Sequence, residues 1–269
     1  MNACRIVKVA LSLSVVGCSL EVEPDPLSIL ESGRWVDLTH DLSDEALFWP
    51  TAEPFQLDTV FAGYAEGGYY YEAFSFRADE HGGTHLDAPI HFAEAGWRSH
   101  EIPLESLTGP AAVVDVSESA MVDRDYQVTM EDIENWEARH GTSVDGHILL
   151  LRTGYHEFWP DAEAYMGTAL RGEEGVAELS FPGIHPATAE WLAGHRDVKA
   201  VGLDTPSLDY GRSTLFRTHR ILFEQNIPGF ENVANLNALP EAGAYVVALP
   251  TRIRGGSGGP LRIAAWLPE

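Results

Sequence analysis

Four side chains that could bind a metal or move a proton lie within one segment of this sequence, HGGTHLDAPIH. They are His81, His85, Asp87 and His91. Neutral imidazole nitrogens together with carboxylate oxygens suit a borderline divalent cation such as zinc or manganese. The alternative is a loop of hydrogen-bonded histidines. The density of potential ligands, in a segment without a low-complexity repeat, favours the metal site.

The backbone of this segment is expected to be extended. His81 and His85 are four positions apart and would share one face of a helix, but the two glycines between them and Pro89 disfavour a helix. On a strand, His85 and Asp87 point to the same side because successive side chains alternate. The glycines then allow a sharp turn that returns His81 to that side.

Two further groups of residues could complete a site, and their spacing alone leaves both open. His219 precedes Glu231 by twelve positions, and spacing does not decide between a metal ligand and a surface histidine. Phe48 and Trp49 lie beside a proline in a loop. They could be a plug of the hydrophobic core or a wall for a flat substrate.

Alternating apolar and aromatic runs predict a series of strands. These cover residues 34–39, 55–61, 69–77, 111–116, 147–152, 198–203, 244–249 and 262–267. A capping box that begins at Thr129 predicts a helix as far as about Arg139, and a second helix is expected over 186–193. Because strands and helices are interleaved without an internal repeat, we expect one mixed α/β domain.

The bulk composition restricts the partners. The chain has 269 residues, of which 45% are hydrophobic, and a net charge of -24. This charge argues against nucleic acid and against an anionic membrane as partners of the folded domain.

The N-terminal residues resemble an export signal. Arg5 and Lys8 precede an apolar run over 9–16, which is too short to span a bilayer. Val-Val-Gly-Cys, ending at Cys18, resembles a bacterial lipobox, in which the cysteine is lipidated. The alternatives are an ordinary signal peptide cut nearby and a misassigned start.

These features divide the chain into three parts and predict an exported cell-envelope lipoprotein, facing the periplasm or the outer surface. We expect a signal peptide over 1–17, a lipidated cysteine and acidic tether over 18–33, and the folded domain that contains the candidate metal ligands over 34–269. With Cys4 removed and Cys18 lipidated, no thiol remains to bind metal or act as a nucleophile.

The histidine segment resembles the HxGTHxDxPxH signature of the cyclase family, which includes bacterial kynurenine formamidases of tryptophan catabolism and isatin hydrolases. The resemblance extends along nearly the whole chain after residue 33. It implies a single mixed-sheet domain of the swivelling β/β/α type. It also implies that His81, His85 and Asp87 bind metal, and that His219 and Glu231 complete a centre of one or two ions.

The same resemblance gives His91 the role of proton donor and acceptor. It matches Trp49, with Phe48 beside it, to a substrate-side tryptophan of the formamidases. It therefore implies a metal-dependent hydrolase of the C–N bond in an aryl formamide or an isatin-like cyclic amide, in a dimer or larger homo-oligomer. The alternative is a non-catalytic metal-binding lipoprotein, which would have no need of a proton-transfer residue beside its ligands.

Overall fold

The computed structural model describes residues 32–268. The expected signal peptide and nearly all of the expected tether lie outside the described residues. Within them, no helix combines the length and apolar character needed to cross a bilayer.

Eight strands form one mixed sheet in the order β1-β12-β11-β5-β7-β9-β10-β4. Their bounds are β1 Arg34–Asp37, β4 His85–Asp87, β5 Thr108–Asp115, β7 Ile148–Arg152, β9 Ala200–Leu203, β10 Gly229–Glu231, β11 Ala242–Pro250 and β12 Gly258–Leu267. The pairs β5–β7, β7–β9 and β9–β10 are parallel, and the others are antiparallel. Because β4 also pairs with β12, the sheet closes on itself.

Helices and short strands fill the connections. The helices are α2 Leu104–Leu107, α3 Ser117–Val122, α4 Met130–His140, α5 Ala162–Met166, α6 Gly172–Glu178, α7 Pro186–His195 and α8 Arg217–Glu224. Among residues 32–268, three 3-10 helices cover Pro89–His91, Tyr155–Phe158 and Leu236–Ala238, and β6 Gln127–Val128 pairs with β8 Gly183–Ile184. The predicted capping box of α4 is confirmed, with Thr129 and Asp132 each bonding the other's backbone.

The predicted buried strand over 147–152 separates two hydrophobic clusters. Ile148 and Leu150 join apolar residues from strands all round the closed sheet, whereas Leu149 and Leu151 face the layer formed by α4, α7 and α8. The alternation arises because successive side chains of a strand point to opposite faces. The sheet is therefore packed on both sides, and it gives β4 and β10 a rigid support.

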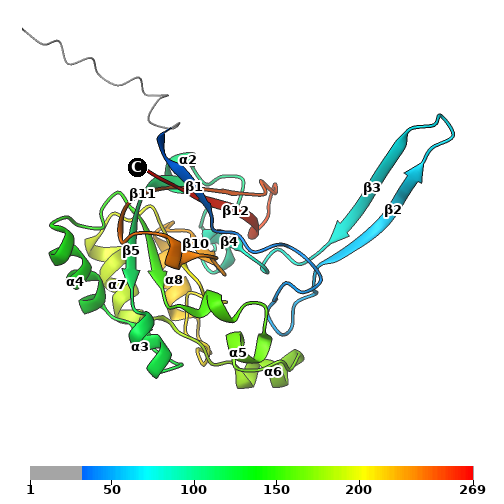
Figure 1. The fold of residues 1–269 in the computed structure, drawn as a ribbon. Coiled ribbons are helices and arrows are strands. Elements are labelled where there is room, and N and C mark those ends of the chain that lie inside the picture. Colours follow the sequence, from blue (N-terminus) through cyan, green and yellow to red (C-terminus); the bar gives the residue numbers. More distant parts are fainter. Residues whose placement is uncertain (1–31, 269) are drawn as a thin grey trace, which may run out of the picture.

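One feature departs from this compact body. Strands β2, Gln56–Tyr64, and β3, Tyr70–Arg77, pair only with each other and project as a long hairpin arm (Figure 1). The two predicted strands exist, but their aromatic side chains do not contribute to the main core. Tyr64 and Tyr69, near the tip, are 78% and 62% exposed.

Candidate metal centre

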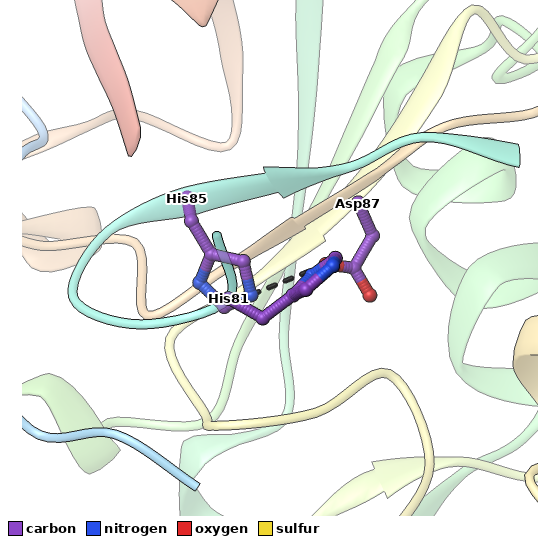
Figure 2. A group of neighbouring side chains, drawn as sticks. All are labelled: His81, His85 and Asp87. Atoms are coloured by element: carbon purple, nitrogen blue, oxygen red, sulfur yellow. Dashed lines mark hydrogen bonds and ion pairs between the residues drawn. The ribbon is translucent and has the colours of Figure 1, made fainter. Parts of the chain in front are cut away.

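The turn before β4 brings His81 back to the strand that carries His85 and Asp87. Gly83 has a φ of +59°, a conformation that glycine adopts without strain. Gly82 lies against the ring of Phe48, so a Cβ there would come within 2.0 Å of the ring. Figure 2 shows His85 and Asp87 on the same side of β4, with His81 beside them, as the extended reading of this segment predicts.

These three side chains form the first of two groups that could hold a metal ion. His81 Nδ1 lies 2.6 Å from Asp87 Oδ1, and His85 Nε2 lies 3.2 Å from the same oxygen. The strand that holds His85 and Asp87 is buried along its whole length and is paired on both edges, with β10 and with β12. Its short backbone therefore has little freedom to move the ligands apart.

Helix α8 and strand β10 supply the second group. Antiparallel pairing sets Glu231 opposite His85, and α8 presents His219 to the same point. His219 Nε2 lies 3.0 Å from Glu231 Oε1 and 3.3 Å from Asp87 Oδ2. The ligand atoms of Asp87, His219 and Glu231 lie within 4.8 Å of one another, as do those of the first group. Asp87 belongs to both groups, so its two oxygens could each face a cation.

Hydrogen bonds fix which nitrogen of each buried histidine faces the centre. His219 Nδ1 donates to Asp209 at 2.7 Å, and His85 Nδ1 donates to the carbonyl of Gly83 at 2.9 Å. Both Nε2 lone pairs then point at the carboxylates. His85 Nε2 is buried and has no hydrogen-bond partner among the described residues. An acceptor left unpaired in this way fits a cation, because burial without a partner is costly.

The electrostatics of the centre also favour a cation. Burial alone would raise the pKa of Asp87, but the charge of His81 and hydrogen bonds from His219 and His81 hold that pKa well below its usual range. Burial alone would lower the pKa of His219, but hydrogen bonds to Asp209, Asp87 and Glu231 outweigh burial and raise that pKa well above its usual value. Without metal, the carboxylates recruit protons to the imidazoles; a divalent ion would replace these protons.

His91 lies beside the centre and is not part of either ligand group. Its ring stacks on that of His81 with centroids 3.9 Å apart, and it lines the cavity above the metal centre. Burial lowers the pKa of His91 to about 4. The imidazole is therefore neutral at pH 7 and able to accept a proton.

A cavity of about 500 Å³ opens above the two ligand groups. Aromatic rings of Phe48, Trp49, Phe92 and Phe216 line it. The Trp49 ring stands between Phe181 and Phe216, at 6.4 Å and 6.2 Å between centroids. Phe48 is 3% exposed and packs in a hydrophobic cluster with Ala46 and Phe55, and both Phe48 and Trp49 line the cavity. The size and lining suit a small aromatic molecule.

Sequence reasoning missed several residues of the site. Asp209, which orients His219, lies in a polar loop, 204–209, for which a simple turn was equally compatible with the pattern. Phe92 and Phe216 gave no signal, because a single aromatic residue after a turn is common in any core. Ser257, in a glycine-rich loop, lies 3.0 Å from His81 Nε2.

Removal of divalent metal is expected to destabilise the protein, because the buried carboxylates lose their cation. At a free ion concentration of about 100 times Kd, binding contributes about 2.7 kcal/mol. For a domain of this size that corresponds to a fall in Tm of roughly 5–10 °C on adding a chelator. Scanning calorimetry with and without the chelator measures the change. An unchanged Tm that persists after complete metal removal would contradict a buried cation site.

A family model described as "Putative cyclase" matches residues 36–210. Among curated proteins, the chain is 30% identical to an isatin hydrolase of Roseibium aggregatum over 71% of this chain and 73% of the other. It is also 30% identical to a kynurenine formamidase of Salinibacter ruber, over 84% and 94% of the two chains. Among solved structures, isatin hydrolase A from Ralstonia solanacearum has a TM-score of 0.79 at 31% identity, covering 91% and 98%.

Proposed function

The chain belongs to the cyclase family, and from this premise we propose that it is a metal-dependent hydrolase of the C–N bond in an aryl formamide or a cyclic amide. One observation carries the proposal: two ligand groups that share Asp87 lie at the base of an aromatic cavity, beside a histidine that is not a ligand. Relatives named isatin hydrolase and kynurenine formamidase act on substrates of these two kinds.

The residues present can be assigned to the steps of amide hydrolysis. A bound divalent ion supplies Lewis-acid polarisation and lowers the pKa of water. His91 takes a proton from the attacking water and returns it to the leaving nitrogen as the C–N bond breaks. Trp49 and Phe216 hold the aromatic ring of the substrate against the cavity wall and limit the access of bulk water. A purely metal-carrying protein would leave His91 and this cavity without a role.

The ion we propose is zinc or manganese, in one or two copies. Three imidazoles and two carboxylates form a donor set that suits either metal. The sharing of Asp87 between the two groups supports two ions. Elemental analysis of the protein loaded with each metal measures the number of ions per protomer. A value of one would mean that only one of the two ligand groups binds an ion.

A hydrolysis screen tests the proposed reaction. Purified, chelator-stripped protein is supplied with N-formylkynurenine or isatin, with and without added zinc or manganese. We expect ring opening or deformylation only with metal, and a return of activity on metal addition after chelation. Tight metal binding without hydrolysis of either substrate, or of related aryl amides, would favour the metal-carrying alternative.

Trp49→Ala is expected to weaken substrate binding with a smaller effect on turnover. Loss of a stacking wall costs about 1–2 kcal/mol, so KM for an aromatic substrate rises roughly five- to thirtyfold. Trp35→Ala is the matched control, because Trp35 is 55% exposed on β1, on another part of the molecule. Steady-state kinetics give KM for both variants. Equal KM values for Trp49→Ala and Trp35→Ala would show that Trp49 does not contact the substrate.

We also propose that the hairpin arm docks on a second copy of this chain. An isolated two-stranded hairpin is only marginally stable in water. An arm with exposed apolar side chains on both faces therefore needs a partner surface to pack against. Nine large apolar side chains of the arm are 39–78% exposed. They are Leu57, Val60, Phe61, Tyr64, Tyr69, Tyr70, Tyr71, Phe74 and Phe76.

The area of the arm supports a dimer. With about 200 Å² for each large side chain, the arm exposes roughly 1,000 Å² of apolar surface. Exchange of two arms about a twofold axis buries roughly 2,000 Å², which lies within the range of stable interfaces. The arm carries no lysine, and Asp58, Glu66 and Glu72 outnumber its one arginine, Arg77, so an anionic membrane is a poorer partner.

Size-exclusion chromatography with light scattering tests the arm. We expect twice the protomer mass for the wild type, and one protomer mass for a Phe74→Glu, Phe76→Glu double variant. Leu104→Glu, which changes an exposed leucine on α2 outside the arm, keeps the dimer. A monomeric wild type, or one whose arm binds neutral vesicles instead, would contradict the proposal.

Finally, we propose that the protein is exported and anchored at the cell envelope through lipid on Cys18. The support is the lipobox-like sequence alone, since these residues lie outside the described range. Metabolic labelling with a clickable palmitate analogue is expected to mark the wild type and not Cys18→Ala. Labelling of neither protein would favour an ordinary signal peptide.

A further inference from the structure

A carboxylate and a hydroxyl hold the outer side of His81, where no metal ligand lies. Ser257 donates to Glu80 Oε2 twice, from its backbone nitrogen at 2.8 Å and from its hydroxyl at 2.7 Å. His81 Nε2 lies 3.0 Å from the same hydroxyl oxygen. The three side chains therefore form a chain of hydrogen bonds that ends at Asp87, through His81 Nδ1.

The backbone around Ser257 is tied to the ligand strand. Ala88, directly after Asp87, donates its N–H to the carbonyl of Ser257 at 2.9 Å. Gly258 pairs with Asp87 across β12 and β4. The His81 ring packs on this glycine so closely that a Cβ there would lie 2.6 Å from the ring. Ser257 is thus placed by the same pairing that places Asp87, and the distance between them is set by the sheet.

Proton counting along this chain assigns the tautomer of His81. The Glu80 carboxylate only accepts, so the single hydroxyl proton of Ser257 is used in the 2.7 Å hydrogen bond to Glu80. At the 3.0 Å contact Ser257 Oγ must therefore accept, and His81 Nε2–H donates. When the ring is neutral its lone pair is on Nδ1, facing Asp87; the 2.6 Å contact between Nδ1 and Asp87 in the ion-free protein needs a proton between the two atoms, and the ion would take the place of that proton. His85 and His219 have the opposite arrangement, with the proton on Nδ1.

We propose that Glu80 and Ser257 are positioning residues that fix the ring and tautomer of His81, so that it binds the divalent ion through Nδ1. This inference rests on the proposed function, since it requires the metal centre. His81 is the ligand that needs such support: its side chain is 23% exposed, whereas those of His85, Asp87 and His219 are 3% exposed. The rings of His85 and His219 are held by their burial and by their hydrogen bonds to Gly83 and Asp209.

Metal titration of the full-length, chelator-stripped protein tests the pair. Manganese or zinc is added to the wild type, to Ser257→Ala, to Glu80→Ala and to the double variant, and calorimetry gives Kd. We expect Ser257→Ala to raise Kd roughly 10- to 100-fold. Because Glu80 acts through Ser257, the double variant should bind no more weakly than Ser257→Ala. Ser257→Thr keeps the hydroxyl and should restore most of the affinity.

Ser99→Ala is the matched control. Its hydroxyl is buried near the same loop and bonds only the carbonyl of Thr251, at 3.2 Å. The absorption spectrum of the cobalt-loaded proteins gives a second readout, because it reports the ligand field. It should change in Ser257→Ala and Glu80→Ala but not in Ser99→Ala. Circular dichroism of the metal-free variants checks that each is folded.

The possible results distinguish an error in the role of Glu80 and Ser257 from an error in the proposed function. If the wild type binds no divalent ion, both are wrong. If the wild type binds metal and hydrolyses amides, while Ser257→Ala and Glu80→Ala match Ser99→Ala in Kd and spectrum, only the role of the pair is wrong. If the two single effects add fully in the double variant, Glu80 does not act through Ser257.

Discussion

Asp87→Asn is expected to abolish both metal binding and hydrolysis. Asp87 is the one residue common to both ligand groups, and its two oxygens face His81 and His85 on one side and His219 on the other. An amide keeps the shape of the side chain but removes the charge and one acceptor oxygen. We expect less than a tenth of the wild-type metal content, and a loss of activity of roughly 10³-fold or more.

Elemental analysis and steady-state kinetics measure the two effects in the same preparation. Asp145→Asn serves as the control, because Asp145 is an exposed carboxylate that accepts hydrogen bonds remote from the cavity. An Asp87→Asn protein that retained full metal would show that the shared position of Asp87 is not what holds the ion.

His91→Ala is expected to retain metal and lose turnover. The ring lines the cavity and stacks on His81, but it contributes no atom to either ligand group. Loss of a positioned proton-transfer group lowers kcat by about 10²–10⁴-fold. His91→Gln, which keeps a hydrogen-bonding side chain of similar size, should not restore the rate.

Metal content decides between two interpretations of an inactive His91→Ala protein. Wild-type content with low kcat supports proton transfer by His91. A joint loss of metal and activity would instead make His91 a ligand, or a necessary support of His81 through their stacked rings.

Local patterns in the sequence predicted the parts of the site that depend on local physics. The alternation of His85 and Asp87 and the glycine turn that returns His81 follow from backbone geometry within a few residues. The capping box of α4 is equally local. The family resemblance, rather than spacing, was needed to associate His219 and Glu231 with this strand.

The parts that were not predictable depend on contacts between distant segments. Asp209 acquires its role only because α8 turns His219 toward it, and Ser257 acquires its role only where β12 meets β4. In the same way, the pattern of β2 and β3 predicts strands but not the sheet they join. An alternation of apolar residues looks the same whether its partner is the main core or another surface.

The double pairing of β4 has a consequence for how the protein matures. During synthesis, the segment with His81, His85 and Asp87 leaves the ribosome long before β10 and β12, which pair with β4 on both edges. A nascent chain therefore has an incomplete set of ligands and binds a cation weakly. Capture of the ion is therefore expected late in folding, after the distant segments of the domain have paired around β4.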